Sequence, residues 1–169
     1  MTGTASDWVN RFGGKLVLVL LDNKYTPSIK KGRSLWGLQR DLTYRCEAGE
    51  LITVPAGFVT DLASIPRWCW TVLPPDGPWV KAAVVHDFLY ATSGTGVWKR
   101  RSDGRTRAEP YSREEADGIF REALENRGVD PLRRFILWAA VRVGGRWGWG
   151  KDDSRQKTTA EDEAFVTER

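Results

Sequence analysis

The chain has 169 residues, about the length of one domain, with a formal net charge of +4, 28% charged residues and 41% hydrophobic residues. This balance is ordinary for a globular protein, so wholesale disorder and a fibrous fold are excluded. Tryptophan is abundant, with nine residues, whereas His86 is the single histidine. A site that needs two histidines from one chain is therefore excluded as well.

The first half of the chain predicts short strands. A leader over residues 1–14 precedes residues 15–21, a continuous apolar run that is typical of a buried strand. Apolar and polar residues alternate over residues 36–44, which predicts one half-buried strand. Residues 50–54 and 58–60 predict two further strands joined by a proline-glycine turn. The front of the chain is therefore expected to be a small antiparallel β-region.

Beyond residue 65 the pattern predicts helices. Proline at a first helical position favours a short helix over residues 66–71. The turn Asp76-Gly77-Pro78 is expected to open a largely buried helix over residues 79–90. Ser112 and Glu115 have the spacing of a capping box, and Gly128 ends the helix that they start.

A last helix is predicted after Asp130, which is followed by proline. It ends at Gly144-Gly145, and its core-facing side is expected to consist of Leu132, Phe135, Ile136, Ala139 and Val143. The sequence thus predicts an α+β fold, with a small N-terminal antiparallel β-region packed against about three C-terminal helices. Residues 1–150 are expected to form one domain, and residues 151–169 a polar, flexible tail.

The helix predicted over residues 79–90 carries the only histidine. His86 and Tyr90 are four residues apart and share a helix face, whereas Asp87 points about 100° away. Apolar residues surround the pair, and a buried polar group without a partner costs about 1–3 kcal/mol. Histidine is also well suited to proton transfer near neutral pH. Two interpretations stay open: a general base, or a histidine that fixes two helices in the core.

Asp117, on the helix that follows Ser112, is the candidate to orient the imidazole. Two helices joined by a loop usually pack antiparallel, which would bring Asp117 and Glu114 close to His86 or Tyr90. A carboxylate in that place stabilises the imidazolium, as it does in catalytic triads. The alternative is a salt bridge from Asp117 to Arg113 or Arg121 on its own helix.

The segment FVTDLASIP, residues 58–66, supplies Asp61 and Ser64 at a junction between strand and helix. Asp61 could join His86 and Asp87 in a polar cluster, and Ser64 could be a nucleophile. Capping of the following turn and helix is the alternative for both residues. Ser64 lacks the context of a nucleophile elbow, so a serine hydrolase is disfavoured.

Several of these segments form an ordered series: VPAGFVTDLASIPR, AAVVHDFLY, SREEAD and GVDPLRRFILWAAVRVGG. The series resembles an uncharacterised family of tailed-phage and prophage proteins, defined by F-x-T-D-x-A-S-I-P, H-D-x-L-Y and R-x-x-A-D, and covers about residues 50–145. The resemblance implies a phage origin, without an assigned activity. The host cytoplasm or the virion is then the expected location.

The predicted helix pair is also similar, more weakly, to calcium-dependent secreted phospholipases, through H-D-x-x-Y and a later A-x-x-x-F. This similarity implies His86 as the base for a water molecule, Asp87 as a calcium ligand and Tyr90 as a support. Asp61 is the other candidate ligand for a divalent cation such as calcium. The chain departs from the pattern because the glycine-rich calcium loop and the disulfides are absent, and because the carboxylate sits one turn late, at Asp117.

Other features predict compartment and partners. Cys46 and Cys69 are expected to be buried thiols in a reducing compartment, because their spacing disfavours zinc and a disulfide framework. The start of the chain lacks a signal-peptide pattern, and no apolar run is long enough to cross a membrane. Basic clusters at residues 24–45 and 97–107 leave a nucleic-acid partner open, with solvated loops as the alternative.

The tryptophans could form a platform for a sugar, a lipid or another protein. Trp147 and Trp149 are the pair expected to be most exposed. Two functions therefore stay open. One is a hydrolase acting on an envelope polymer or a lipid ester, with the candidate residues His86, Asp87, Asp117, Asp61 and Tyr90. The other is a non-enzymatic virion, tail or assembly component, whose partners are phage structural proteins or components of the host envelope.

Overall fold

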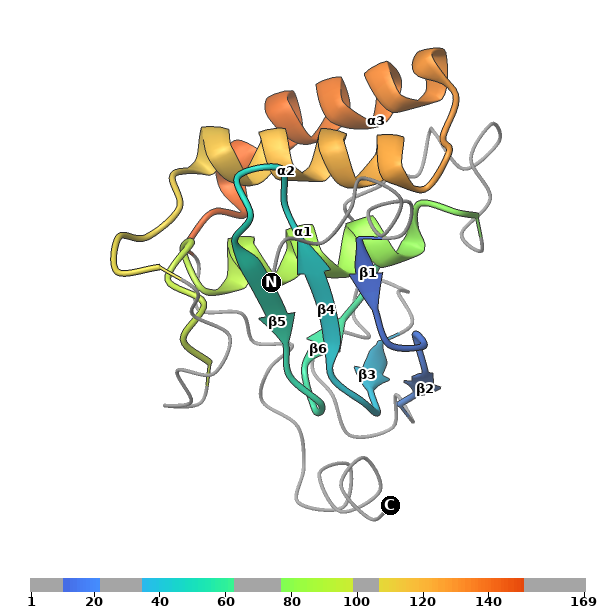
Figure 1. The fold of residues 1–169 in the computed structure, drawn as a ribbon, viewed down its shortest axis with the longest axis vertical. Helices are drawn as coiled ribbons and strands as arrows, with labels where there is room; N and C mark the ends of the chain where they lie inside the picture. The colour runs from blue at the N-terminus through green and yellow to red at the C-terminus, as the bar shows by residue number, and fades with distance from the viewer. Residues whose placement is uncertain (1–10, 22–34, 63–76, 99–106, 151–169) are drawn as a thin grey trace, which may run out of the picture.

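The structure, a computed structural model, describes residues 11–21, 35–62, 77–98 and 107–150 (Figure 1). These residues form six short strands followed by three α-helices and one turn of 3-10 helix. The predicted α+β fold, with strands first and helices later, is confirmed. The short helix predicted over residues 66–71 and the predicted tail lie outside the described residues.

The strands form two antiparallel sheets of three strands each. The first sheet has the order β1-β4-β5, from the strands Phe12–Gly13, Leu42–Arg45 and Leu51–Val54. The second has the order β2-β3-β6, from the strands Leu18–Leu20, Trp36–Leu38 and Val59–Thr60. The register pairs Tyr44 with Ile52 in the first sheet and Gly37 with Val59 in the second. The predicted antiparallel β-region is therefore present, divided into two parts.

Two strand predictions were wrong in detail. The single strand predicted over residues 36–44 is two strands in different sheets, because the chain turns between β3 and β4. Asp41 in this turn accepts a hydrogen bond of 2.8 Å from the backbone N–H of Ala56. Leu38 and Leu42 are both fully buried, so the alternation continues through the turn and conceals it. In addition, β1 lies inside the predicted leader and pairs with β4.

The helices are α1 (Val80–Ala91), α2 (Arg113–Asn126) and α3 (Pro131–Gly144), and the 3-10 turn η5 (Gly145–Trp147) follows α3 directly. The capping box at the start of α2 is confirmed. Ser112 Oγ accepts a hydrogen bond from the backbone N–H of Glu115 at 3.2 Å, and Glu115 Oε2 accepts one from the backbone N–H of Ser112 at 2.7 Å. Asp130 is the N-cap of α3, and its Oδ1 atom accepts a hydrogen bond of 3.0 Å from the backbone N–H of Arg133. At α1 the N-cap is Trp79, which makes no side-chain cap hydrogen bond. The helix therefore begins at Val80, one residue later than predicted.

The elements lie in layers, with α1 against the strands, α2 above α1 and α3 outermost (Figure 1). The residues of α1 from Ala82 to Tyr90 are all buried, which explains why this helix has no polar face. The core contains aromatic and aliphatic side chains from both sheets and from α1 and α2, among them Phe12, Leu38, Tyr44, Ile52, Phe58, Trp79, Phe88, Phe120 and Leu124. None of the helices within the described ranges has the length and apolar character needed to cross a membrane.

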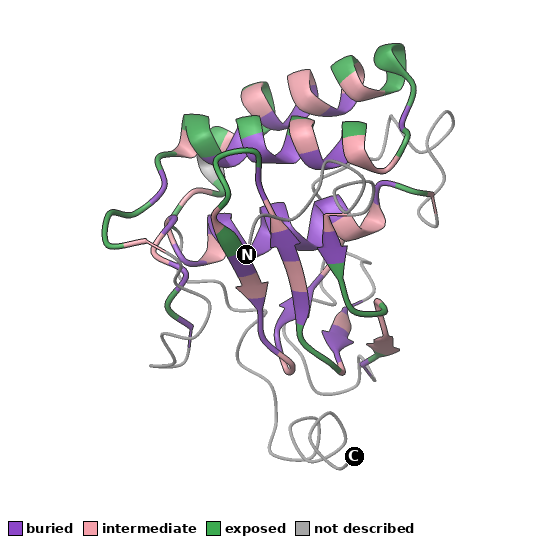
Figure 2. Cartoon of the chain, in the orientation of Figure 1, coloured by how far each residue is buried: buried purple, intermediate pink, exposed green. Residues whose placement is uncertain are grey.

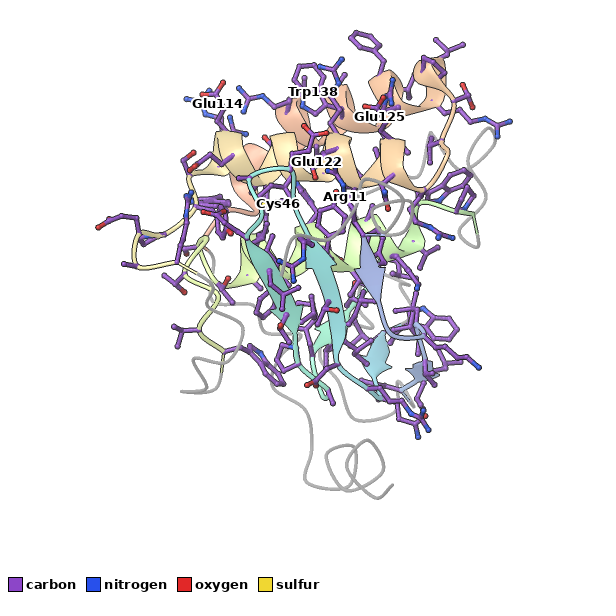
Figure 3. The ribbon with its side chains drawn as sticks, viewed as in Figure 1. Arg11, Cys46, Glu114, Glu122, Glu125 and Trp138 are labelled. Carbon is purple, nitrogen blue, oxygen red and sulfur yellow. The ribbon has the colours of Figure 1, made fainter. Side chains whose placement is uncertain are left out.

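A polar contact fixes α2 to the first sheet. One carboxylate oxygen of Glu122 accepts hydrogen bonds from Tyr44 Oη at 2.6 Å, Arg11 Nη1 at 2.8 Å and the backbone N–H of Glu47 at 2.9 Å. Figure 3 shows Glu122 on the side of α2 that faces the strands, close to Arg11. Burial and the neighbouring Glu122 raise the pKa of Tyr44, so this tyrosine stays protonated and serves as a hydrogen-bond donor. The contact holds α2 at a fixed height above the sheet.

The predicted core-facing side of α3 was wrong. The buried residues of α3 are Leu137, Ala140 and Val141. Leu132, Phe135 and Val143, which were expected in the core, are 68%, 58% and 75% exposed. The reason is that α3 is apolar nearly all round, so that helical spacing alone cannot distinguish its two sides. In Figure 2 the side of α3 turned away from α2 is drawn as exposed or intermediate.

Candidate functional site

Three side chains converge on the carboxylate of Asp117, in α2. His86 Nε2 lies 3.0 Å from Asp117 Oδ1, and the Tyr90 hydroxyl donates to the same oxygen at 2.7 Å. Arg142 Nη1, from α3, lies 3.1 Å from the other oxygen, Oδ2. Three helices therefore contribute to one buried polar group, and each oxygen of Asp117 is occupied.

The site is enclosed in the core. Asp117 has no exposed surface, and His86 and Tyr90 are 3% and 8% exposed. Burial alone would raise the pKa of Asp117, but the hydrogen bonds from His86 and Tyr90, with a smaller one from Arg142, bring the pKa below its ordinary value. Burial, together with the nearby Asp117, raises the pKa of Tyr90. Asp117 is therefore an anion, and Tyr90 a protonated donor to it.

The position of His86 follows from the local sequence. His86 and Tyr90 are one turn apart on α1, with ring centroids separated by 4.2 Å. The imidazole also packs against the ring of Phe120, with ring centroids 4.7 Å apart. The rings of Tyr90 and Phe120 therefore limit its movement. Because α2 runs antiparallel to α1 (Figure 1), Asp117 lies opposite both His86 and Tyr90. The predicted approach of Asp117 to His86 is confirmed, whereas Glu114 is exposed.

The end of α3 is a part of the site that the sequence did not indicate. Arg142 takes the place predicted for Arg113 or Arg121, because its side chain reaches Asp117 from the next helix. Arg113 instead donates to the backbone carbonyl of Arg142 at 3.2 Å, and Arg121 lies over the ring of Trp138, 5.5 Å from its centroid. A basic residue in the last turn of a helix ordinarily indicates a favourable interaction with the helix dipole, so Arg142 carried no separate signal.

Gly145 and Trp149 complete the enclosure around Tyr90. A Cβ atom at Gly145 would overlap the Tyr90 hydroxyl and ring. The ring of Trp149 meets Tyr90 edge-on, with centroids 5.0 Å apart. The half-buried Trp149 is therefore a packing residue of this site, which corrects its predicted role in an exposed pair.

Asp87 points to a different part of the fold. Its Oδ2 atom accepts a hydrogen bond of 2.5 Å from the hydroxyl of Thr60, at the end of β6. The Thr60 hydroxyl in turn accepts from the backbone N–H of Leu62 at 3.0 Å. Leu62 has a φ of 52°, a left-handed conformation that is unusual for a branched side chain and therefore strained. The half-buried Asp61 lies between Thr60 and Leu62.

The hydrogen bonds described above connect Asp117 with His86 and Tyr90, and Asp87 with Thr60. His86, Tyr90 and Asp117 belong to the α1–α2 interface, whereas Asp87 and Asp61 lie toward the second sheet. Calcium takes six to eight oxygen ligands. Within the described ranges, no group of three or more His, Cys, Asp or Glu residues is placed to hold a metal ion. Asp87 and Asp61 do not by themselves provide such a site, so the cation stays a prediction.

Some predicted features cannot be placed. Ser64, Cys69 and much of both basic clusters lie outside the described residues. Cys46 is a buried free thiol, as predicted, and its sulfur lies 3.8 Å from a carboxylate oxygen of Glu50. Burial raises the pKa of this thiol, which disfavours the thiolate and hence reactivity.

Comparison with known proteins identifies a family. No curated protein and no solved structure matches the chain. A family model described as a protein of unknown function, DUF1353, matches residues 36–141. The matched segment includes His86, Tyr90 and Asp117, and ends one residue before Arg142. Because it covers more than half of the chain, this protein belongs to the DUF1353 family.

Proposed function

We propose that this protein is a phage- or prophage-encoded hydrolase that uses His86 as a general base toward water, acting on an ester of a lipid or of an envelope polymer. The observation that supports this function best is the 3.0 Å contact between His86 Nε2 and the buried carboxylate of Asp117. A carboxylate in this position fixes the tautomer of a histidine and stabilises its cation.

The proposed reaction uses the other ring nitrogen of His86, Nδ1. A water molecule attacks the carbonyl carbon of the ester while Nδ1 takes a proton from the water. The carbon–oxygen bond to the leaving group then breaks, and the departing oxygen receives the proton from the imidazolium. During this cycle the positive charge of His86 is balanced by Asp117, the pKa of which is already lowered by its donors.

Tyr90 and Arg142 are positioning residues in this proposal. Both donate to Asp117, at 2.7 Å and 3.1 Å, and so restrict the carboxylate to one orientation. The weak similarity to calcium-dependent phospholipases supports the same assignment, because a second-helix aspartate orients the histidine there. The position of Asp117 one helical turn later is compatible with the role, since its carboxylate reaches His86. The phage setting is supported by the ordered sequence motifs.

The test is hydrolysis by the full chain of p-nitrophenyl butyrate, of phosphatidylglycerol vesicles and of purified O-acetylated peptidoglycan, the acetyl groups of which are held by ester bonds. We expect product release from at least one of these, reduced about 10²- to 10⁴-fold in His86→Gln, with the circular dichroism spectrum unchanged. Glu114→Gln is the matched control, because Glu114 is an exposed residue of α2. Assays with calcium and with a chelator test the predicted cation separately. No hydrolysis of any substrate, or equal rates for His86→Gln and the wild type, would contradict the proposal.

The second candidate is a non-enzymatic virion, tail or assembly component, in which the same network only fixes the three helices. The low exposure of His86 and Asp117, 3% and 0%, favours it. This function predicts that His86→Gln lowers the melting temperature strongly, whereas the hydrolase predicts a small change, since active sites tend to sacrifice stability for function. Neighbouring genes for tail proteins would favour the structural component, and neighbouring genes for lysis proteins would favour the hydrolase.

A further inference from the structure

The start of α1 lacks the acceptor that a helix N-terminus usually receives from its own chain. Its N-cap makes no side-chain cap hydrogen bond, and its first turn contains no acidic residue. The first backbone N–H groups of a helix have no partner within the helix, and the helix dipole gives this end a partial positive charge. A helix N-terminus of this kind is suited to bind an anion.

The indole of Trp79, the N-cap residue, places a buried donor at the same helix end. Trp79 is 2% exposed. Of the buried side-chain nitrogen and oxygen atoms in the described ranges, only Nε1 of Trp79 lacks a hydrogen-bond partner. A Cβ atom at Gly77 would overlap Cε2 of this indole. Because Nε1 is bonded to Cε2, the unsatisfied N–H lies beside the Gly77-Pro78 turn that precedes α1, where an acceptor would be stabilised.

Two cations lie around this turn. Arg127, which follows the end of α2, donates through Nε to the carbonyl of Pro78 at 3.3 Å. Lys81 donates through Nζ to the carbonyl of Gly14 at 2.9 Å. The end of α2 and the start of α1 lie at the same end of the helix pair (Figure 1). Burial and the charge of Arg127 lower the pKa of Lys81, so the two cations are close enough to repel each other.

Both cations keep donors for a ligand. Their contacts described above are with backbone carbonyls, and no ion pair joins either of them to a carboxylate in the described part of the chain. The Nε contact of Arg127 leaves its two terminal nitrogens, which can bind two oxygens of an anion together. Lys81 and Arg127 are half-buried and Pro78 is exposed, so a ligand can reach the turn from solvent.

We propose that the start of α1 is a binding site for a phosphate group, held by Arg127, by Lys81 and by the indole N–H of Trp79. A phosphate monoester has a charge of about −1.5 to −2 at pH 7 and more acceptor oxygens than a carboxylate. It therefore matches two cations, an indole donor and a helix N-terminus better than a carboxylate does. Inorganic phosphate and the phosphate of a lipid headgroup share this chemistry. The site is at the opposite end of α1 from Tyr90 and does not depend on the proposed hydrolase.

An NMR titration of the labelled full chain with inorganic phosphate, at constant ionic strength, tests the proposal. We expect saturable shifts of the amide signals at the start of α1, with a dissociation constant of about 1–10 mM. Arg127→Gln and Lys81→Gln should each weaken binding at least about tenfold, and two separate variants keep the test valid if one alters the fold. Arg127→Lys keeps the charge but not the planar fork, so its affinity should be intermediate.

Arg121→Gln is the matched control, because Arg121 is an exposed arginine of the same helix, α2. It should bind phosphate as the wild type does. Shifts that do not saturate, or equal affinity in Arg127→Gln, Lys81→Gln and the wild type, would overturn the proposal.

The indole signal of Trp79 gives a second measurement on the wild-type chain. Its Nε1–H resonance is assigned by its loss in Trp79→Phe. We expect this resonance to move downfield with phosphate, because the N–H gains an acceptor, while those of Trp138 and Trp149 stay in place. Equal shifts with phosphate and with chloride at the same ionic strength would show general screening of charge and overturn the site.

Phosphatidylglycerol vesicles distinguish the two sources of the phosphate group. Co-sedimentation with these vesicles that inorganic phosphate competes away, and that Arg127→Gln reduces, would assign the site to a lipid headgroup. Binding of inorganic phosphate without co-sedimentation would assign it to a soluble phosphate-bearing ligand. Co-sedimentation without any binding of inorganic phosphate would overturn the site in favour of another surface of the chain.

Discussion

Gly145 lies directly against the phenol of Tyr90, so that the end of α3 holds the side chain that donates to Asp117. The backbone of Gly145 is helical, with a φ of −69°, and does not itself require glycine. Glycine is required by the space that Tyr90 occupies. The neighbouring Gly144 is different, because a Cβ atom there would meet nothing within 4 Å.

These two glycines provide a matched pair of substitutions. Gly145→Ala is expected to displace Tyr90 and to lower the free energy of unfolding by about 1–3 kcal/mol, as overpacking does. Gly144→Ala is expected to be neutral or to stabilise by up to about 1 kcal/mol, because alanine favours the helix. Urea denaturation of both variants measures the difference. Equal stabilities would show that Tyr90 is not held by Gly145.

Asp117→Asn removes the charge at the centre of the site while it keeps the size of the side chain. The variant leaves Arg142 without its anion. It also places an amide NH₂, itself a donor, where His86, Tyr90 and Arg142 need an acceptor. We expect the free energy of unfolding to fall by about 3 kcal/mol, at the low end for a broken buried pair, because Arg142 is partly exposed. Glu114→Gln, the same kind of change at an exposed position of α2, should alter it by less than about 0.5 kcal/mol. Similar losses in both variants would contradict this role of Asp117.

The same charge predicts a dependence on acid pH. The pKa of Asp117 is lower in the folded chain than the ordinary value of about 3.9. Its contribution is therefore fully present above the unfolded pKa and is lost as the pH falls through the folded pKa. Tyr90, the pKa of which is raised by burial and by Asp117, keeps its proton throughout this window.

The stability difference between the wild type and Asp117→Asn is the quantity to follow, since other carboxylates cancel in it. It should be largest near pH 5 and decrease steadily below about pH 4. Denaturation at a series of pH values measures it. A difference that stays constant into strong acid would mean that the pKa of Asp117 is not lowered.

The sequence predicted the α1–α2 half of the site because its signals are local. The capping box of Ser112 and Glu115 fixes where α2 begins, and the four-residue spacing of His86 and Tyr90 fixes their common face. Once α1 and α2 pack antiparallel, Asp117 can meet both side chains. Each of these steps depends on residues close together in the chain or on a general packing rule.

The α3 half was not predictable in the same way. Arg142 is 25 residues from Asp117, and its role depends on how α3 rotates on α2. The sequence of α3 does not fix that rotation, because both of its sides are apolar. The prediction accordingly chose the exposed side, with Leu132 and Val143, as the buried one. The strand prediction over residues 36–44 was wrong for a related reason. The alternation of apolar and polar residues continues through the turn between β3 and β4, so the turn cannot be detected from this alternation.

The tautomer of His86 tests the central claim most directly. Because His86 is the only histidine, its ring nitrogens give the only histidine signals in a long-range ¹H–¹⁵N correlation spectrum of the labelled chain. If Asp117 holds the ring through Nε2, the neutral imidazole carries its proton on Nε2, and Nδ1 shows the resonance of an unprotonated nitrogen. In Asp117→Asn the two tautomers should become mixed. A wild-type spectrum with the proton on Nδ1 and an unprotonated Nε2 would contradict the proposed base.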